Sequence, residues 1–331
     1  MRITVVGAGS WGTTVAALAA RSNPTVLWAR RAELAENINT SAENPDYLPG
    51  FRLPYGLRAT ADLAEAVEGA EAILMAVPSH GFRTVAEGMT PGVADDALVV
   101  SLTKGIEQKT LARMTEVLAE VLTDHDSDRI GVLTGPNLAR EVMEGQPAAT
   151  VIAMRDTEAA ARLQHALMDP TFRVYTNPDV VGCETAGALK NVMAIAAGMA
   201  KGLGFGHNTL AALITRALAE LTRLGIALGG KPETFAGLAG MGDLIATCMS
   251  DQSRNNQVGM KLARGRRLDD VIAEMNMVAE GVKTTEAVLE LARRHRVEVP
   301  IAAQVGKVLY EGAHPREAVL TLMTRRPKAE V

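Results

Sequence analysis

The strongest constraint on the fold of this chain is the alternation of short apolar runs with helical stretches in its first half. The segments RITVVG, TVLWA, AILMAV, ALVVSL, IGVLTG and ATVIAM are almost continuously apolar, with helix-like stretches such as residues 10–20 between most of them. Apolar strands joined by helices are typical of a parallel sheet that is covered on both faces. The pattern therefore predicts an α/β, doubly wound parallel sheet, with FRVYTNPD as its last strand.

After Pro178 the pattern changes to an all-helical one. Helices are expected at roughly 179–203, 208–228, 254–264, 268–275, 281–295, 300–311 and 315–323. Pro300 and Pro315 stand where the first turns of two of these helices would begin, a position that suits proline. With 331 residues the chain is long enough for two domains, which are predicted to cover residues 1–178 and 179–331.

The composition excludes several classes of protein. A net charge of −4 gives no basic surface for nucleic acid or for stable anchoring to an anionic membrane. The two cysteines and six histidines form no metal-binding pattern, so neither a metal site nor a disulfide framework is expected. The N-terminus resembles no signal peptide, and no apolar run was expected to approach the length of a membrane span. A reduced, cytoplasmic protein is predicted.

The segment GAGSWG follows the first predicted strand and opens a helix. Its glycines, Gly7, Gly9 and Gly12, would allow a tight turn and a close approach of the backbone to a pyrophosphate at the helix N-terminus. The alternative is a glycine-rich turn that binds nothing. The strand–turn–helix context favours a dinucleotide, and therefore NAD(H) or NADP(H), bound by residues 1–178.

The second strand ends in LWARR, where an NAD-selective site would place an acidic residue for the ribose 2′-hydroxyl. Arg30 and Arg31 stand there instead, and a guanidinium suits a 2′-phosphate. NADP(H) is therefore expected to be accepted and preferred over NAD(H). The alternative is that both arginines are solvated surface charges.

Polar residues follow two later strands. Lys104 lies just beyond one strand, and Gly135 and Asn137 lie beyond another, at the sheet edge where ligands of open α/β sheets bind. Asn137 could instead simply cap the helix that follows it.

The helical half contains the compact polar segment GMGDLIATCMSDQSRNN, which includes Asp243, Ser253, Arg254 and Asn255. A hydroxyl, a guanidinium and an amide in sequence could form an anion cradle at a helix start. The alternative is that Ser253 is an N-cap followed by exposed residues.

Lys190 is a lone cation in the apolar stretch GCETAGALKNVMAIAAG. Small residues at Gly187, Ala194 and Gly198 would let another group approach this helix closely. Lysine is seldom fully buried without a partner, so Lys190 is either a rim lysine with its ammonium in water or an acid/base group in a cleft. The spacing alone leaves both readings open.

The glycine loop, YLPGFRLP, AVPSH, TKGIE, GPNLAREV, ETAGALKNVMAIAAG, GDLIATC, SRN and VAEG together resemble the bacterial NAD(P)-dependent glycerol-3-phosphate dehydrogenases, over almost the whole chain. The resemblance implies a Rossmann domain followed by a helical domain like that of 6-phosphogluconate dehydrogenase. It implies reversible reduction of dihydroxyacetone phosphate to sn-glycerol 3-phosphate, which supplies glycerophospholipid synthesis.

The resemblance also implies residue roles. Lys190 would be the proton donor and acceptor. Beyond the resemblance, we expect Lys104 to orient the substrate and polarise its carbonyl, and Asp243 to fix Lys190 by a charge-assisted hydrogen bond. Contacts to the nucleotide are implied for Ser10, Trp11, Arg30, Lys104, Ala139, Arg254, Val278 and Glu280. Contacts to the substrate are implied for Lys104, Gly135, Asn137, Lys190, Asp243, Ser253, Arg254 and Asn255. Asn137 departs from the family, which usually has Ser or Thr at this position.

Two rival interpretations remain at this level. A reductase of another hydroxy acid or sugar phosphate could use the same two-domain plan, but GDLIATC with SRN tells against it. An inactive nucleotide sensor is disfavoured because both Lys104 and Lys190 are retained. Apolar helices in the second domain could form a homodimer interface, or could equally be core.

Overall fold

The computed structural model describes residues 1–275, 279–327 and 329. The chain divides into two compact units, Met1–Glu184 and Thr185–Val331. This division falls inside helix α8 (Val180–Gly202), a few residues beyond the predicted boundary at 178/179. Each unit is described separately below.

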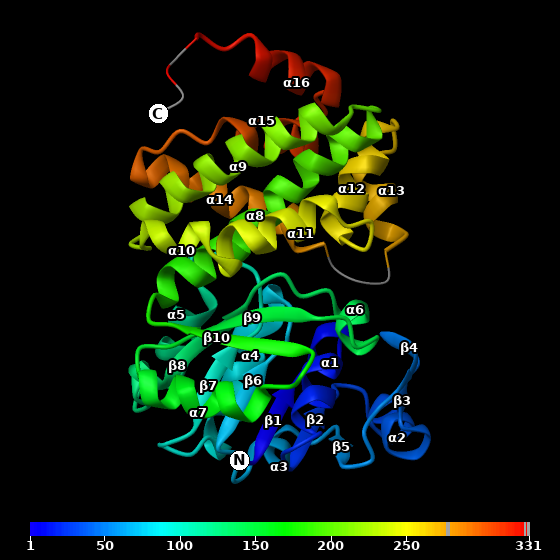
Figure 1. Cartoon of the computed structure of the whole chain (residues 1–331), viewed down its shortest axis with the longest axis vertical. Helices are drawn as coiled ribbons and strands as arrows, with labels where there is room; N and C mark the ends of the chain where they lie inside the picture. The colour runs from blue at the N-terminus through cyan, green and yellow to red at the C-terminus, as the bar shows by residue number, and fades with distance from the viewer. Residues whose placement is uncertain (276–278, 328, 330–331) are drawn as a thin grey trace. The chain divides into compact units, whose positions relative to one another are not determined.

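The first unit contains an eight-stranded sheet (Figure 1). Its strands lie side by side in the order β10 (Phe172–Asn177), β9 (Ala148–Ala153), β8 (Ile130–Thr134), β7 (Leu98–Ser101), β6 (Ala72–Met75), β1 (Ile3–Val6), β2 (Thr25–Trp28) and β5 (Leu57–Thr60). β1 therefore lies inside the sheet, flanked by β2 and β6 in parallel register.

One pairing in this sheet differs from the prediction of a wholly parallel sheet. β8 and β9 are antiparallel, whereas every other neighbouring pair in the sheet is parallel. The connection between them contains only the short helix α6 (Ala139–Met143), and an antiparallel pair needs no long crossover. A strand buried on both faces has the same apolar pattern in either orientation, so the direction of β9 could not be predicted.

Three strands were not predicted. β3 (Glu43–Asn44) and β4 (Leu48–Arg52) form a small hairpin, and β5 is the edge strand of the large sheet. Proline and glycine within β4, and the two polar residues within β5, hide the strand signal.

Helices cover both faces of the sheet. The core on one face includes side chains of α1 (Ser10–Ala19), α2 (Ala32–Ser41), α6 and α7 (Thr157–Leu167). The core on the other face includes side chains of α3 (Leu63–Val67), α4 (Ser79–Met89) and α5 (Met114–Val121). Two single-turn helices, η1 (Thr90–Gly92) and η2 (Ser127–Arg129), lie in connections between helices and strands. The predicted doubly wound architecture is confirmed.

The rest of the described chain is helical. After α8 come α9 (His207–Ala227), α10 (Pro232–Ala236), the π-helical turn η3 (Leu238–Gly242), α11 (Asp243–Met249), α12 (Arg254–Ala263), α13 (Leu268–Ala273), α14 (Glu280–His295), α15 (Pro300–Tyr310) and α16 (Pro315–Met323). The predicted helices are confirmed, and Pro300 and Pro315 do begin α15 and α16. The helices α10 and α11 were missed, because glycines and polar residues around them suggested a loop.

Helix α8 also corrects the expectation that no apolar run approaches a membrane span. Among the described residues it is the one helix long and apolar enough to cross a bilayer, by length and composition alone. Within its most apolar window, however, 94% of the residues are buried in the folded chain. A core helix of a folded domain passes the same test, and Glu184 and Lys190 are polar members of it.

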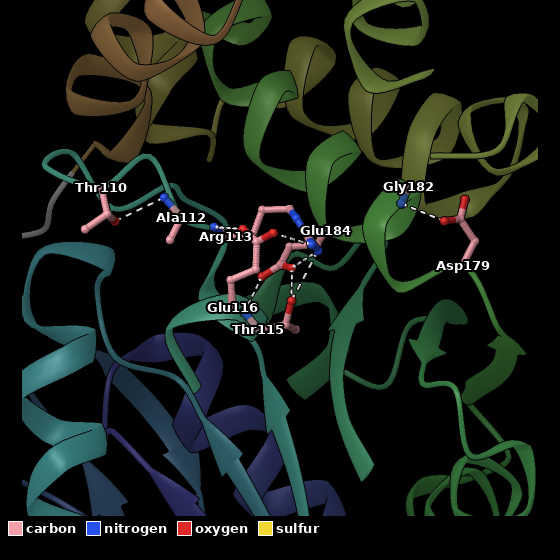
Figure 2. A network of polar contacts seen from close by, with 8 residues as sticks. All are labelled: Thr110, Ala112, Arg113, Thr115, Glu116, Asp179, Gly182 and Glu184. Carbon is pink, nitrogen blue, oxygen red and sulfur yellow. Dashed lines mark hydrogen bonds and ion pairs between the residues drawn. The ribbon is translucent and has the colours of Figure 1, made fainter. Parts of the chain in front are cut away.

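The first turn of α8 is tied to the start of α5 by a buried carboxylate (Figure 2). Glu184 accepts hydrogen bonds from the backbone N–H and the hydroxyl of Thr115, and its Oε2 lies 3.0 Å from Nη1 of Arg113. Burial raises the pKa of Glu184, although the Arg113 charge and the Thr115 donors act in the opposite direction. Asp179 accepts a hydrogen bond from the Gly182 N–H and so caps the same turn.

Candidate active site

The glycine loop lies between β1 and α1, as predicted. Gly7 has a φ of +120°, and a Cβ there would lie 2.7 Å from the Ala76 carbonyl oxygen. A Cβ at Gly12 would lie 1.9 Å from the carbonyl oxygen of Gly7. These two glycines therefore let the turn pack against itself and against Ala76, the residue that follows β6. At Gly9 a Cβ would meet nothing within 4 Å, so this part of the loop faces open space at the N-terminus of α1.

Two side chains of the loop contact the rest of the first unit. The Ser10 hydroxyl donates to the Tyr47 carbonyl oxygen at 2.6 Å. The half-buried Trp11 ring packs against Phe172, with 6.3 Å between ring centroids. The backbone of Ala139, another predicted nucleotide contact, begins α6 and lies 3.5 Å from the Thr14 hydroxyl.

The two arginines after β2 have different surroundings. Both are exposed, but Arg31 forms an ion pair and a hydrogen bond with Asp46, and this hydrogen bond and charge raise the pKa of Arg31. Arg31 is therefore an exposed charge that has an acidic partner. Any anion that binds Arg31 must compete with the Asp46 carboxylate.

The structure brings Lys104 and Gly135 together at the carboxyl edge of the sheet. The Lys104 ammonium donates to the Gly135 carbonyl oxygen at 2.9 Å, and Gly135 has a φ of +148°. These two predicted substrate contacts follow the neighbouring strands β7 and β8.

Asn137 is not the helix cap suggested as an alternative, because Leu138 is the residue that precedes α6. Its amide nitrogen donates to the Ala149 carbonyl oxygen at 3.0 Å, and its amide oxygen accepts from the Thr150 hydroxyl at 2.8 Å. Asn137 thus ties the connection after β8 to β9.

In the second unit, Lys190 is buried, with 5% of its surface exposed, and the rim interpretation is wrong. Its ammonium lies 2.6 Å from Oδ1 of Asp243 and also donates to the Thr247 hydroxyl. Asp243 and Thr247 are one turn apart on α11, and their oxygens lie 3.3 Å from each other. The structure therefore brings Lys190 and Asp243 together and adds Thr247, which sequence reasoning missed.

The small residues around Lys190 have a packing role at one position. A Cβ at Gly198 would lie 2.0 Å from the Asn256 carbonyl oxygen, and one at Gly259 would lie 2.1 Å from that of Ile195. The group that approaches α8 at Gly198 is therefore the backbone of α12.

The SRN triplet combines an N-cap with a buried amide. Ser253 caps α12 through the Asn256 N–H at 3.3 Å, as the structural alternative predicted. Asn255, however, is buried: its amide nitrogen donates to Asn191 at 3.1 Å and its amide oxygen accepts from the Gly281 N–H at 2.9 Å. This side chain links α8, α12 and α14.

Arg254 is the first residue of α12, and its side chain is exposed. The charge of Glu280, at the start of α14, favours the charged form of the Arg254 guanidinium. Val278, the other predicted nucleotide contact in this region, lies outside the described residues.

The residues that were missed differ in how visible they are in the sequence. Thr247 follows Asp243 by one helical turn within GDLIATC, and Asn191 directly follows Lys190, so both could have been found once α11 was recognised. Asn44 and Tyr47, which contact the glycine loop, carry no local signal of that role.

A glycine loop at the start of a mainly parallel, doubly wound sheet, followed by a helical unit with a buried lysine–carboxylate pair, defines a dehydrogenase of the nicotinamide-nucleotide class. The comparisons with known proteins make this specific. Residues 2–160 match the family model of the NAD-dependent glycerol-3-phosphate dehydrogenase N-terminus, and residues 179–320 match that of the C-terminus. The chain belongs to the NAD-dependent glycerol-3-phosphate dehydrogenase family.

Individual relatives agree with the family match. The chain is 52% identical to the glycerol-3-phosphate dehydrogenase [NAD(P)+] of Thermobifida fusca, covering 99% of this chain and 98% of the relative. It is 50% identical to the glycerol-3-phosphate dehydrogenase [NAD(P)+] of Streptomyces griseus, and the match covers 100% of this chain and 98% of the relative. The crystal structure of glycerol-3-phosphate dehydrogenase from Coxiella burnetii has 37% identity and a TM-score of 0.92, covering 98% of this chain and 99% of that one.

Proposed function

We propose that this chain catalyses the reversible, NAD(P)H-dependent reduction of dihydroxyacetone phosphate to sn-glycerol 3-phosphate, with Lys190 as the proton donor. The observation that carries the proposal is the buried Lys190–Asp243 pair in a chain of the glycerol-3-phosphate dehydrogenase family. A buried ionisable pair is costly to retain for stability alone, which favours a chemical role.

When bound, the nicotinamide supplies the hydride that reduces the ketone carbon. The carbonyl oxygen then needs a proton, and the Lys190 ammonium is the proposed donor. An ordinary lysine, with a pKa of about 10.4, carries that proton at neutral pH. Asp243 and Thr247 would hold the ammonium in a fixed direction, because the Asp243 carboxylate and the Thr247 hydroxyl both accept hydrogen bonds from it.

The proposed nucleotide contacts begin with the glycine loop, where the open space at Gly9 fits a pyrophosphate at the N-terminus of α1. Arg30 is proposed to bind a 2′-phosphate, with Arg31 held back by Asp46. The further proposed contacts are Ser10, Trp11, Lys104, Ala139, Arg254 and Glu280, together with Val278.

For the substrate, Arg254 and the N-terminal turn of α12 are proposed to bind the phosphate, with Ser253 and Asn255 shaping that turn. Binding energy from this remote phosphate would orient the ketone. Lys104 is proposed to orient the carbonyl, with Gly135 as its backbone partner. Asn137 is a further proposed substrate contact; its amide has a second N–H and a second oxygen lone pair beyond those used by Ala149 and Thr150.

The cellular setting follows from the same proposal. Glycerol 3-phosphate is the backbone of glycerophospholipids, so the enzyme would supply their synthesis from the cytoplasm. NADPH is the expected preferred cofactor, and a homodimer is the expected assembly if the chain is not monomeric.

The deciding experiment follows NADPH absorbance with the purified full chain. Dihydroxyacetone phosphate should cause rapid oxidation of NADPH, and a panel of 2-keto acids and other sugar phosphates should be far poorer substrates. Preference for another substrate would support a different reductase, and NADPH binding without any turnover would support a nucleotide sensor.

A further inference from the structure

The segment between α2 and β5 contains a fully buried asparagine. Asn44, the second residue of β3, has 0% of its surface exposed. A primary amide is costly to bury unless its donors and its acceptor are used. The partners of Asn44 therefore indicate what the residue does.

The side-chain hydrogen bonds of Asn44 connect the glycine loop and α1 to the β3–β4 hairpin. Its amide nitrogen donates to the Ala8 carbonyl oxygen at 2.9 Å and to the Thr13 hydroxyl at 2.8 Å. Its amide oxygen accepts from the Tyr47 N–H at 3.2 Å. Tyr47 in turn accepts from the Ser10 hydroxyl at 2.6 Å, which closes a ring of hydrogen bonds between the loop and residues 44–47.

The Ala8 contact has a direct consequence for the loop. The Ala8 carbonyl and the Gly9 N–H belong to one planar trans peptide, so they point in opposite directions. Holding the carbonyl against Asn44 therefore turns the Gly9 N–H away from Asn44. Gly9 is also the loop residue at which an added Cβ would meet open space.

We propose that Asn44 is a positioning residue that sets the Ala8–Gly9 peptide so that the Gly9 N–H faces the nucleotide pyrophosphate. This inference rests on the proposed nucleotide site. Without the Asn44 donor, the Ala8 carbonyl loses its partner and the peptide can rotate. The loop then has to be reordered each time a nucleotide binds, which weakens binding without changing the reacting groups.

Asn39 provides a matched control for a merely structural asparagine. It lies in α2, and its amide donates to the Ala59 carbonyl oxygen and accepts from the Ala59 N–H, each at 2.8 Å. It therefore makes the same kind of amide–backbone contact, but to β5 instead of to the glycine loop.

The experiment measures NADPH binding to the full chain by fluorescence titration, and steady-state kinetics with dihydroxyacetone phosphate. Asn44→Ala should raise the Kd and KM for NADPH about tenfold, as expected for the loss of a buried hydrogen bond. The kcat at saturating NADPH and the KM for dihydroxyacetone phosphate should stay within about twofold of wild type. Asn39→Ala should leave the Kd for NADPH within about twofold, even where it lowers the melting temperature equally.

Asn44→Ala leaves a buried gap and could prevent folding. The nearly isosteric Asn44→Asp then decides, because it keeps an acceptor for Tyr47 but removes the donor to Ala8. It should raise the Kd for NADPH while the kcat at saturating NADPH stays within about twofold of wild type.

A folded Asn44 variant with wild-type affinity for NADPH, or an Asn39 variant with an equal loss of affinity, would overturn the inference. Failure of the wild-type chain to bind NADPH at all would instead overturn the proposed function, so the two failures can be told apart.

Discussion

The ammonium nitrogen of Lys190 lies 2.6 Å from Oδ1 of Asp243, and both side chains are almost entirely buried. The two residues are far apart in sequence, on α8 and α11, and the Thr247 hydroxyl joins them. Burying two charges costs free energy that close pairing only partly offsets. The pair therefore points to chemistry at the lysine, and it makes the protonation state of Lys190 testable.

Lys190→Ala should lower kcat for dihydroxyacetone phosphate reduction by about a hundred- to ten-thousand-fold, the usual value of a general acid. Lys201→Ala is the control on the same helix, since Lys201 donates to the Met249 carbonyl oxygen and lies outside the proposed site. Its kcat should stay near that of wild type. Absorbance assays measure kcat of both variants, and circular dichroism shows whether each is folded. Near-normal turnover of a folded Lys190→Ala protein would remove the lysine from the mechanism.

Oxidation of glycerol 3-phosphate should become faster as the pH rises above neutral, because Lys190 must lose its proton before it can accept one. Asp243→Asn removes the negative charge that stabilises the ammonium, so the rising limb of the rate profile should move to lower pH. Thr247→Val should move it less, since a hydroxyl has no charge. The measurement is the pH dependence of kcat, and a limb that moves to higher pH in Asp243→Asn would contradict the assignment.

Asp46→Asn should increase the preference for NADPH over NADH, because it releases Arg31 for the 2′-phosphate. Arg30→Ala should raise the KM for NADPH about tenfold and leave that for NADH nearly unchanged, as expected for one lost charge-assisted hydrogen bond. Arg58→Ala is the control, because Arg58 lies on β5 and is paired with Glu65 of α3. The ratio of kcat/KM values for the two cofactors tests these expectations, and an unchanged ratio in both variants would refute them.

Glu184→Ala should lower the free energy of unfolding by about 3 to 5 kcal/mol, because it leaves Arg113 and the Thr115 donors without their buried partner. Glu116→Ala should cost about 1 kcal/mol or less, although Glu116 also pairs with Arg113, because that pair is half exposed. Figure 2 shows both carboxylates beside Arg113, and denaturant unfolding of the two variants measures how much each contributes to stability. Equal losses in the free energy of unfolding of the two variants would contradict the prediction that the buried Glu184 stabilises the fold more than the exposed Glu116.

Glu220 should make stability depend on pH. Its carboxylate accepts from the backbone N–H groups of Ile301 and Ala302, each at 2.9 Å, and burial raises its pKa to about 7 despite these donors. An unfolded glutamate has a pKa of about 4.3. Between pH values of about 4.3 and about 7, the folded chain therefore keeps a proton on Glu220 that the unfolded chain has already released. The contribution of Glu220 is therefore complete below the unfolded pKa and is lost as the pH rises through about 7.

Glu220→Gln abolishes this titration. The free energy of unfolding of wild type minus that of the variant should fall by roughly 3 kcal/mol from about pH 4 to about pH 8. Chemical denaturation across this range gives the difference, which would be constant if the folded carboxyl titrated normally.

Local pattern was enough to predict the doubly wound sheet and the long helices, because continuous apolar strands and amphipathic or apolar helices have distinct periods. It could not predict the direction of β9, whose ATVIA pattern suits either orientation. It also missed α11, and with it the partnership of Thr247 with Lys190, because the glycines before Asp243 resemble a loop.

The sequence by itself determined the glycine loop, the lone lysine of α8 and the family of the chain, because these depend on residue type and order. Only the tertiary structure decided that Lys190 is buried against Asp243, that Arg31 is held by Asp46, and that Asn44 holds the Ala8 carbonyl. The physical reason is that burial and pairing are properties of groups brought together from distant parts of the chain, and local spacing contains no information about them.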